Sequence, residues 1–193
     1  MNKVGKSVLS LLVLSGLLAG IGVSTEAGLF GFGGESWKEE VLLHDGSKVV
    51  VERTVERGGR HEIGQKPPYK EQRLRFTLPG TNQTITWEDH YSQDLGQANF
   101  LPMVLDISGV TPYLVVYPMG CSSYTKWGRP NPPYVVFQYQ EKEWKRVPLQ
   151  ELPAELNTPN VIFSEPDFKV EQLGTRFVTA EKINEIISRY KQP

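Results

Sequence analysis

The feature that most limits the fold of this chain is a series of short apolar segments, each ended by turn-forming residues. From Trp37 onward, segments rich in Val, Ile, Phe, Tyr and Trp alternate with clusters of Gly, Pro, Asn and Asp. This order is typical of antiparallel strands joined by turns. We therefore expect a mainly β fold: an antiparallel meander of about eight to nine strands, built as an open sheet, a sandwich or a barrel-like closure.

Four hairpins are expected along this meander. The first joins residues 38–44 to 48–55 through Asp45-Gly46, a pair that tolerates the positive φ angles of a tight I′ turn. Apolar and polar residues alternate in the second hairpin, which predicts one wet face, whereas continuous apolar runs in the third suggest strands near the middle of a sheet. These later hairpins join 74–78 to 85–91, 100–107 to 113–117, and 134–139 to 144–147, and a ninth strand is expected at 161–163.

The end of the chain predicts an amphipathic helix. Thr179 is a suitable N-cap residue. The apolar residues that follow it have the i, i+3, i+4, i+7 spacing of one helix face. They are Ile183, Ile186, Ile187 and Tyr190. We expect this helix, over 180–190, to pack on the sheet.

The N-terminus has the order of a secretory signal peptide. Lys3 and Lys6 precede the uncharged apolar run Val8–Val23, and Thr25-Glu26-Ala27 supplies a cleavage site. The run is shorter than the roughly 18 to 20 residues of a membrane span, although an uncleaved anchor is the alternative. No Cys follows the run to accept a lipid.

These patterns divide the chain into three parts. We expect residues 1–27 to be the signal peptide, 28–36 a Gly-rich tether, and 37–193 a single β domain with a C-terminal helix. The expected location is the periplasm or the medium, with no transmembrane span after cleavage.

The charge balance excludes one class of partner. The chain has 21 basic and 22 acidic residues, for a formal net charge of −1, and the two signs are mixed along its length. A nucleic-acid-binding protein normally gathers a basic excess on one face, so that class is set aside. The single cysteine, Cys121, also excludes an intramolecular disulfide.

The three histidines, His44, His61 and His90, do not form a metal motif. No two are four residues apart, as a helix needs to present two imidazoles to zinc. His61-Glu62 lies in a loop rich in Gly and Pro and lacks the second His of a metalloprotease motif. We expect no metal and no cofactor.

Cys121 provides the enzymatic alternative. It follows Pro118-Met119-Gly120, a turn that can expose a nucleophile, and a hydrolase or transferase would pair it with a histidine base such as His61. The opposing interpretation is a small apolar residue buried at a strand end.

Two loops combine prolines with Arg and aromatic or His side chains. The first contains Arg60, His61 and Tyr69, and the second contains Trp127, Arg129 and Tyr134. Such rigid segments suit recognition of a partner. The second loop equally suits a buried corner in which Arg129 stacks on Trp127. We predict that the two loops are neighbours at one end of the meander.

Four motifs together resemble a family of small exported bacterial proteins that has no assigned activity. They are HDG at 44–46, GGRHEIGQ at 58–65, FTLPG at 76–80 and WGRPNPPY at 127–134, and the resemblance covers residues 37–163. It implies bacterial origin and export and supplies no catalytic residue.

These observations lead to one expectation about function. The chain is expected to be an exported, soluble envelope protein with a non-catalytic binding domain. Its two loops would contact an envelope protein or a glycan. The alternative is the enzyme built on Cys121.

Overall fold

The part of the chain that the structure describes folds into nine strands in two open sheets, with three short helices. The computed structural model describes residues 34–59 and 61–190; the expected signal peptide lies outside them. The mainly β fold expected from the sequence is confirmed. The elements are β1 (Glu35–Leu42), β2 (Lys48–Arg57), β3 (Tyr69–Thr77), β4 (Thr84–Asp89), β5 (Phe100–Ser108), β6 (Thr111–Pro118), α1 (Gly120–Lys126), β7 (Val135–Gln140), β8 (Glu143–Val147), a 3₁₀ turn η1 (Leu149–Glu151), α2 (Pro166–Leu173), β9 (Phe177–Val178) and α3 (Ala180–Ile187).

The first sheet has the order β4-β3-β2-β1-β9. Its four long strands are antiparallel, and β9 runs parallel to β1. Alternate residues of β2, β3 and β4 are buried, which confirms the expected wet face. Glu35 already pairs with Val55 in β2, so the last residues of the expected tether belong to the sheet.

The turn between β1 and β2 is longer than predicted. The Leu43 N–H donates to the Ser47 carbonyl, so three residues lie in the loop instead of the two of an I′ turn. Gly46 has φ +84°, as the third residue of such a loop requires.

The second sheet has the order β5-β6-β7-β8, antiparallel throughout. The prediction that both strands of the third hairpin lie near the middle of a sheet is wrong for β5, which is an edge strand. Its apolar run is continuous because both of its faces are covered. One face packs against the first sheet, and the other packs against the segment at 149–163.

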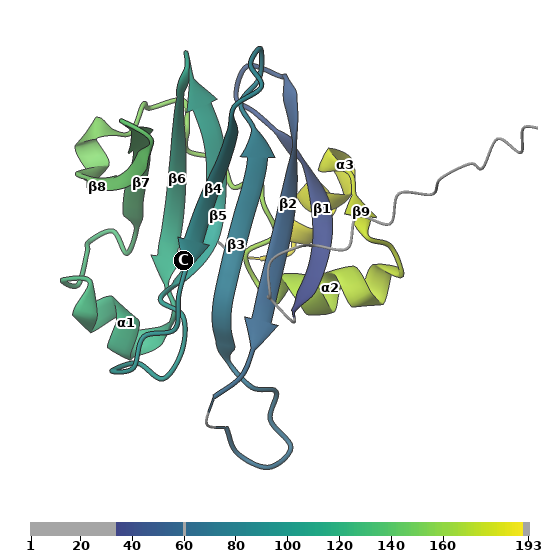
Figure 1. Cartoon of the computed structure of the whole chain (residues 1–193), viewed down its shortest axis with the longest axis vertical. Coiled ribbons are helices and arrows are strands. Elements are labelled where there is room, and N and C mark those ends of the chain that lie inside the picture. Colours follow the sequence, from purple (N-terminus) through teal and green to yellow (C-terminus); the bar gives the residue numbers. More distant parts are fainter. Residues whose placement is uncertain (1–33, 60, 191–193) are drawn as a thin grey trace, which may run out of the picture. The chain divides into compact units, whose positions relative to one another are not determined.

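The main core lies between the two sheets. Val51, Leu74 and Ile85 from the first sheet pack with Leu114 and Val135 from the second. The lower part of the first sheet packs instead on the C-terminal elements, which gather beyond β1 in Figure 1.

The expected C-terminal helix is confirmed as α3. The Thr179 hydroxyl accepts a hydrogen bond from the Lys182 N–H, and Ile183 and Ile186 are buried against the first sheet. The ninth strand, however, is β9 and does not lie at 161–163. In that segment, side chains of β1 and β2 bind both backbone groups of Ile162, and the Val161 N–H donates to the Met103 carbonyl, so no ladder forms.

Ile162 shows how this happens. Its N–H donates to Glu39 Oε2 at 3.0 Å, and its carbonyl accepts from Arg53 Nη1 at 2.6 Å. Glu39 and Arg53 also pair with each other at 3.0 Å, and Glu39 accepts from the Trp37 indole at 2.8 Å. Glu39 is 0 % and Arg53 1 % exposed, so this is a buried ion pair. It fixes the 159–162 segment to the first sheet.

Asn160 fixes the same segment to the second sheet. Its side-chain amide accepts from the Leu105 N–H at 2.9 Å and donates to the Leu105 carbonyl at 2.9 Å, as a paired strand would. It also donates to the Leu42 carbonyl at the end of β1, at 3.0 Å. One amide therefore joins β5, the edge strand of the second sheet, to the end of β1 in the first sheet.

Within the described residues, no helix combines the length and the apolar character needed to cross a bilayer.

Candidate functional site

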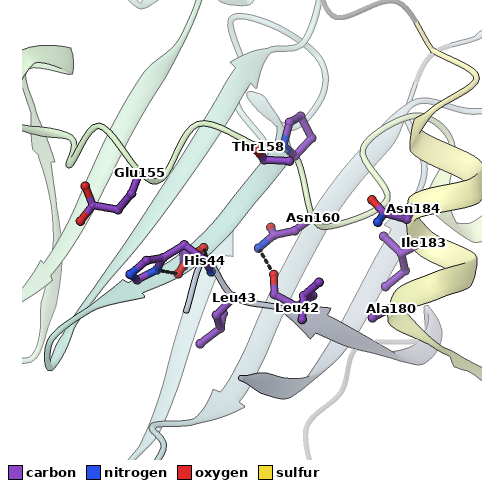
Figure 2. A pocket seen from close by; sticks show the side chains of 11 residues that line it. Leu42, Leu43, His44, Glu155, Thr158, Asn160, Ala180, Ile183 and Asn184 are labelled. Atoms are coloured by element: carbon purple, nitrogen blue, oxygen red, sulfur yellow. Dashed lines mark hydrogen bonds and ion pairs between the residues drawn. The ribbon is translucent and has the colours of Figure 1, made fainter. Parts of the chain in front are cut away.

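A pocket lies at the seam between the two sheets, where β1 ends. Its volume is about 310 Å³, a size that suits a small molecule. Figure 2 shows its lining, which comes from the β1–β2 turn, β5, the 155–160 segment and α3. The lining residues are Leu42, Leu43, His44, Asp106, Glu155, Thr158, Pro159, Asn160, Ala180, Ile183 and Asn184. We call this the His44 pocket.

His44 is the most constrained polar group of the pocket. Its Nδ1 lies 2.7 Å from Asp106 Oδ1, and its backbone N–H donates to Asp106 Oδ2 at 3.0 Å. Asp106 Oδ1 also accepts from the Ile107 N–H at 2.7 Å, so the carboxylate is fully engaged. Because Nδ1 faces Asp106, Nε2 is the ring nitrogen that can meet a ligand.

The charge around His44 favours the imidazolium. The hydrogen bond with Asp106 raises the pKa of His44, and the negative charges of Asp45 and Glu155 act in the same direction, while burial opposes them in part. Nε2 is therefore a hydrogen-bond donor over a wider pH range than in a free histidine.

The other polar groups of the pocket complement this donor. Glu155 is exposed, and Figure 2 shows it on the same side of the pocket as the His44 ring. Leu42 and Ile183 supply apolar surface, and Asn184 is exposed at the side formed by α3. The site can thus offer a donor, an acceptor and an apolar wall to one small polar molecule.

The pocket lacks a partner for nucleophilic catalysis. No cysteine or serine is among its lining residues. The Thr158 hydroxyl lies 3.1 Å from Asn157 Oδ1, to which it donates. A histidine paired with a carboxylate supplies two of the three members of a catalytic triad, and no cysteine or serine of this lining supplies the third.

The first predicted loop projects past the ends of β2 and β3 (Figure 1). Arg60 lies outside the described residues. His61 is exposed, and its Nδ1 lies 3.0 Å from the Gly59 carbonyl oxygen. Ile63 is also fully exposed.

Tyr69 does not lie on the exposed part of that loop. It is buried, and its hydroxyl donates to Asp167 Oδ1 at 2.6 Å. Arg57 donates to both oxygens of Asp167 and lies over the Tyr69 ring. Burial alone would raise the pKa of Asp167, but Arg57 and Tyr69 lower it below its usual value. Tyr69 therefore anchors the base of the loop.

The second loop is divided between the core and the surface. Trp127 packs on Phe100, with ring centroids 4.5 Å apart, and its indole donates to Asn99 Oδ1. The cation above Trp127 is Arg146, which also donates to the Trp127 carbonyl. Arg129, which the buried-corner interpretation places on Trp127, is instead exposed at φ +51°. Tyr134 is half-buried and lines two hollows on the outer side of the second sheet.

The two loops have a common neighbour. The first approaches Gly96 through Gly59, and Lys126, just before Trp127, pairs with Asp94 at 2.9 Å. Both loops therefore adjoin the turn at 92–97. The second loop lines the two hollows beside Tyr134, whereas the first loop lines neither these hollows nor the His44 pocket.

Cys121 is exposed in the first turn of α1. The hydrogen bonds and ion pairs of the described histidines join His44 to Asp106, His61 to Gly59 and His90 to Glu88. They give Cys121 no base. Across residues 34–59 and 61–190, no group of three or more His, Cys, Asp or Glu side chains is arranged to hold a metal ion.

Sequence reasoning missed the pairing of His44 with Asp106. The two residues are 62 positions apart, and their strands lie in different sheets. One signal was present in the sequence: Asp106 is the only charged residue in the apolar run from Phe100 to Ile107. A carboxylate in a strand covered on both faces needs hydrogen-bond partners.

Comparisons with protein-family models, with curated proteins and with solved structures found no match to this chain.

Proposed function

We propose that this chain is an exported, non-catalytic binding domain of the bacterial envelope, and that the His44 pocket is its ligand site. The observation that carries the proposal is the His44–Asp106 pair at the wall of a pocket of about 310 Å³. The contact of Nδ1 with Asp106 fixes the ring, so that Nε2 points away from Asp106 and toward a ligand. The proposed ligand is rich in hydroxyl groups, such as the end of a glycan.

The hydroxyl group fits because it both donates and accepts. It can accept from His44 Nε2 and donate to the Glu155 carboxylate, while carbon atoms of the same ligand contact Leu42 and Ile183. A purely anionic ligand would meet Glu155, Asp45 and Asp106, and the site therefore favours a neutral one.

The wall of the pocket supports binding because it is fixed before a ligand arrives. Asn160 is bonded to both sheets, and Ile162, two residues later, is held by the buried pair of Glu39 and Arg53. A pocket that needs little ordering on binding spends less of its interaction energy on conformational entropy.

Export and family membership belong to the same proposal. They are supported by Lys3, Lys6, the Val8–Val23 run and the four motifs within residues 37–163. We also propose that the exposed side chains of His61 and Arg129 contact a protein of the envelope. Cys121 with a histidine base is not carried forward, because the described contacts bring no histidine to it.

Thermal unfolding in the presence of neutral mono- and disaccharides and amino sugars tests the proposal. A sugar that binds the folded chain raises the melting temperature as its concentration rises above Kd. We expect at least one sugar of this panel to do so, and we expect Asn184→Trp, which places an indole in the pocket, to abolish the rise.

Gln172→Trp is the matched control, because Gln172 is exposed on α2 and does not line the pocket. It should leave the response unchanged. A response that persists in Asn184→Trp would move the binding site elsewhere, and a panel without any response would contradict a hydroxyl-rich ligand.

A further inference from the structure

A second, apolar cavity lies under the segment that covers the outer face of the second sheet. Its volume is about 230 Å³. The floor is formed by β5 and β6, and the cover by η1 and the residues that follow it. The lining residues are Met103, Val104, Val115, Pro132, Tyr134, Leu149, Leu152, Leu156, Asn157 and Pro159.

The polar amide that reaches this cavity is already satisfied. Asn157 Nδ2 donates to the Ala154 carbonyl at 2.9 Å, and its Oδ1 accepts from the Thr158 hydroxyl. The cavity opens to solvent beside the exposed Pro132 and Asn157, and its other lining residues are apolar or half-buried. Its volume exceeds the roughly 150 Å³ of a core cavity that takes up benzene, so it has room for a larger ring.

The walls are rigid enough to keep this shape. Pro132 and Pro159 have fixed φ angles. Leu156 and Met103 are buried in the cluster that packs on the sheet. The Asn160 and Val161 N–H groups both donate to the Met103 carbonyl, which holds the end of the cover against β5. Collapse of the cavity would require these contacts to change.

We propose that this cavity binds a small aromatic or alicyclic molecule of on the order of ten non-hydrogen atoms. A second hollow of about 380 Å³ shares Pro132, Tyr134 and Leu149 with it. That hollow also contains Asn131, Arg146 and Gln150. One polar group on the ligand would therefore face that hollow, with the ring under Leu152 and Leu156. This cavity shares Pro159 with the His44 pocket, and its other lining residues are different.

Calorimetric titration of the whole mature chain with indole tests the site. Purine is the matched probe, because it has the same fused-ring shape and four ring nitrogens that would have to be desolvated without partners. We expect saturable binding of indole and no binding of purine at the same concentrations. Absence of indole binding, or equal binding of purine, would overturn the proposal.

Two substitutions locate the site. Leu149→Trp fills it from the half-buried rim, and Val115→Phe fills it from the sheet. Each should weaken indole binding about tenfold or more, a loss of about 1.4 kcal/mol. Val115→Phe alters a packed strand and can fail to fold. In that case Leu149→Trp alone tests the location of the site.

Asn184→Trp is the matched control, since it blocks the His44 pocket and leaves the apolar cavity unchanged. It should bind indole as the wild type does. Indole binding that survives Leu149→Trp but is lost in Asn184→Trp would assign the probe to the His44 pocket and overturn the second site.

Discussion

Replacing Glu39 by Leu should destabilise the domain strongly, because it leaves the Arg53 guanidinium buried without its partner. Removing one member of a buried ion pair costs about 3–5 kcal/mol. Glu39 also accepts from the Trp37 indole and the Ile162 N–H, so these donors lose their acceptor too. For a domain of this size, each kcal/mol lowers the melting temperature by about 2–4 °C. The expected loss is therefore about 6–20 °C.

The double variant Glu39→Leu with Arg53→Met separates the charge from the other contacts. This variant leaves no buried charge without a partner. Three polar groups still lose their hydrogen bonds: the N–H and the carbonyl of Ile162 and the indole N–H of Trp37. Each lost bond lowers the free energy of unfolding by about 1 kcal/mol. Among the described residues, Arg53 Nε already has no hydrogen-bond partner, so the native pair is not fully satisfied. The double variant should thus be no less stable than either single variant.

Urea unfolding followed by circular dichroism measures all four proteins of this cycle. The free energy lost in the double variant should fall short of the sum of the two single losses by about 3 kcal/mol or more, with similar m-values. Additive losses would refute the reasoning, because they would mean that the two side chains stabilise the domain independently.

Three further predictions concern the ends and the surface of the chain. The intact mass of the natively exported protein should place its N-terminus near Gly28, and a mature form that begins at Met1 would exclude cleavage. Because the folded-state pKa of His44 is raised, its stabilising contribution is complete below its unfolded value of about 6.5 and is lost as pH rises through the folded value. The melting temperature of His44→Gln should accordingly fall further below the wild type at about pH 5.5 than at about pH 9, and a constant difference would contradict this. Arg129→Ala should change the free energy of unfolding by less than about 0.5 kcal/mol, whereas Arg146→Ala should cost about 1 kcal/mol through its contacts with Trp127; equal effects in urea unfolding would contradict the assigned stacking.

The parts of the fold that depend on neighbouring residues were predictable from the sequence. Strand alternation, the Asp45-Gly46 turn and the Thr179 cap are local signals, and the hairpins and α3 appear where these signals predict them. Proline lacks the N–H that a ladder needs, and accordingly Pro102 lies at a bulge and Pro112 near a strand start.

The contacts that hold the 159–162 segment against the two sheets were not predictable in this way. They join residues far apart in the chain: Arg53 reaches Ile162 across 109 positions, and Asn160 reaches Leu42 across 118. The sequence shows each as an isolated polar residue. The same holds for the His44 pocket, which needs the turn after β1, β5 and α3 to meet, and no local pattern contains that information.

The side chain of Asn160 has a consequence for self-association. Strands at the border of a sheet carry unpaired backbone groups, and another chain can add to them and start an aggregate. Here one amide occupies both backbone groups of Leu105 in β5 and the carbonyl of Leu42 in β1. Replacement of Asn160 by an apolar residue would uncover the backbone groups of Leu105 on the edge strand β5 and the carbonyl of Leu42 at the end of β1. We expect such a variant to aggregate more readily, because another chain could pair with these groups.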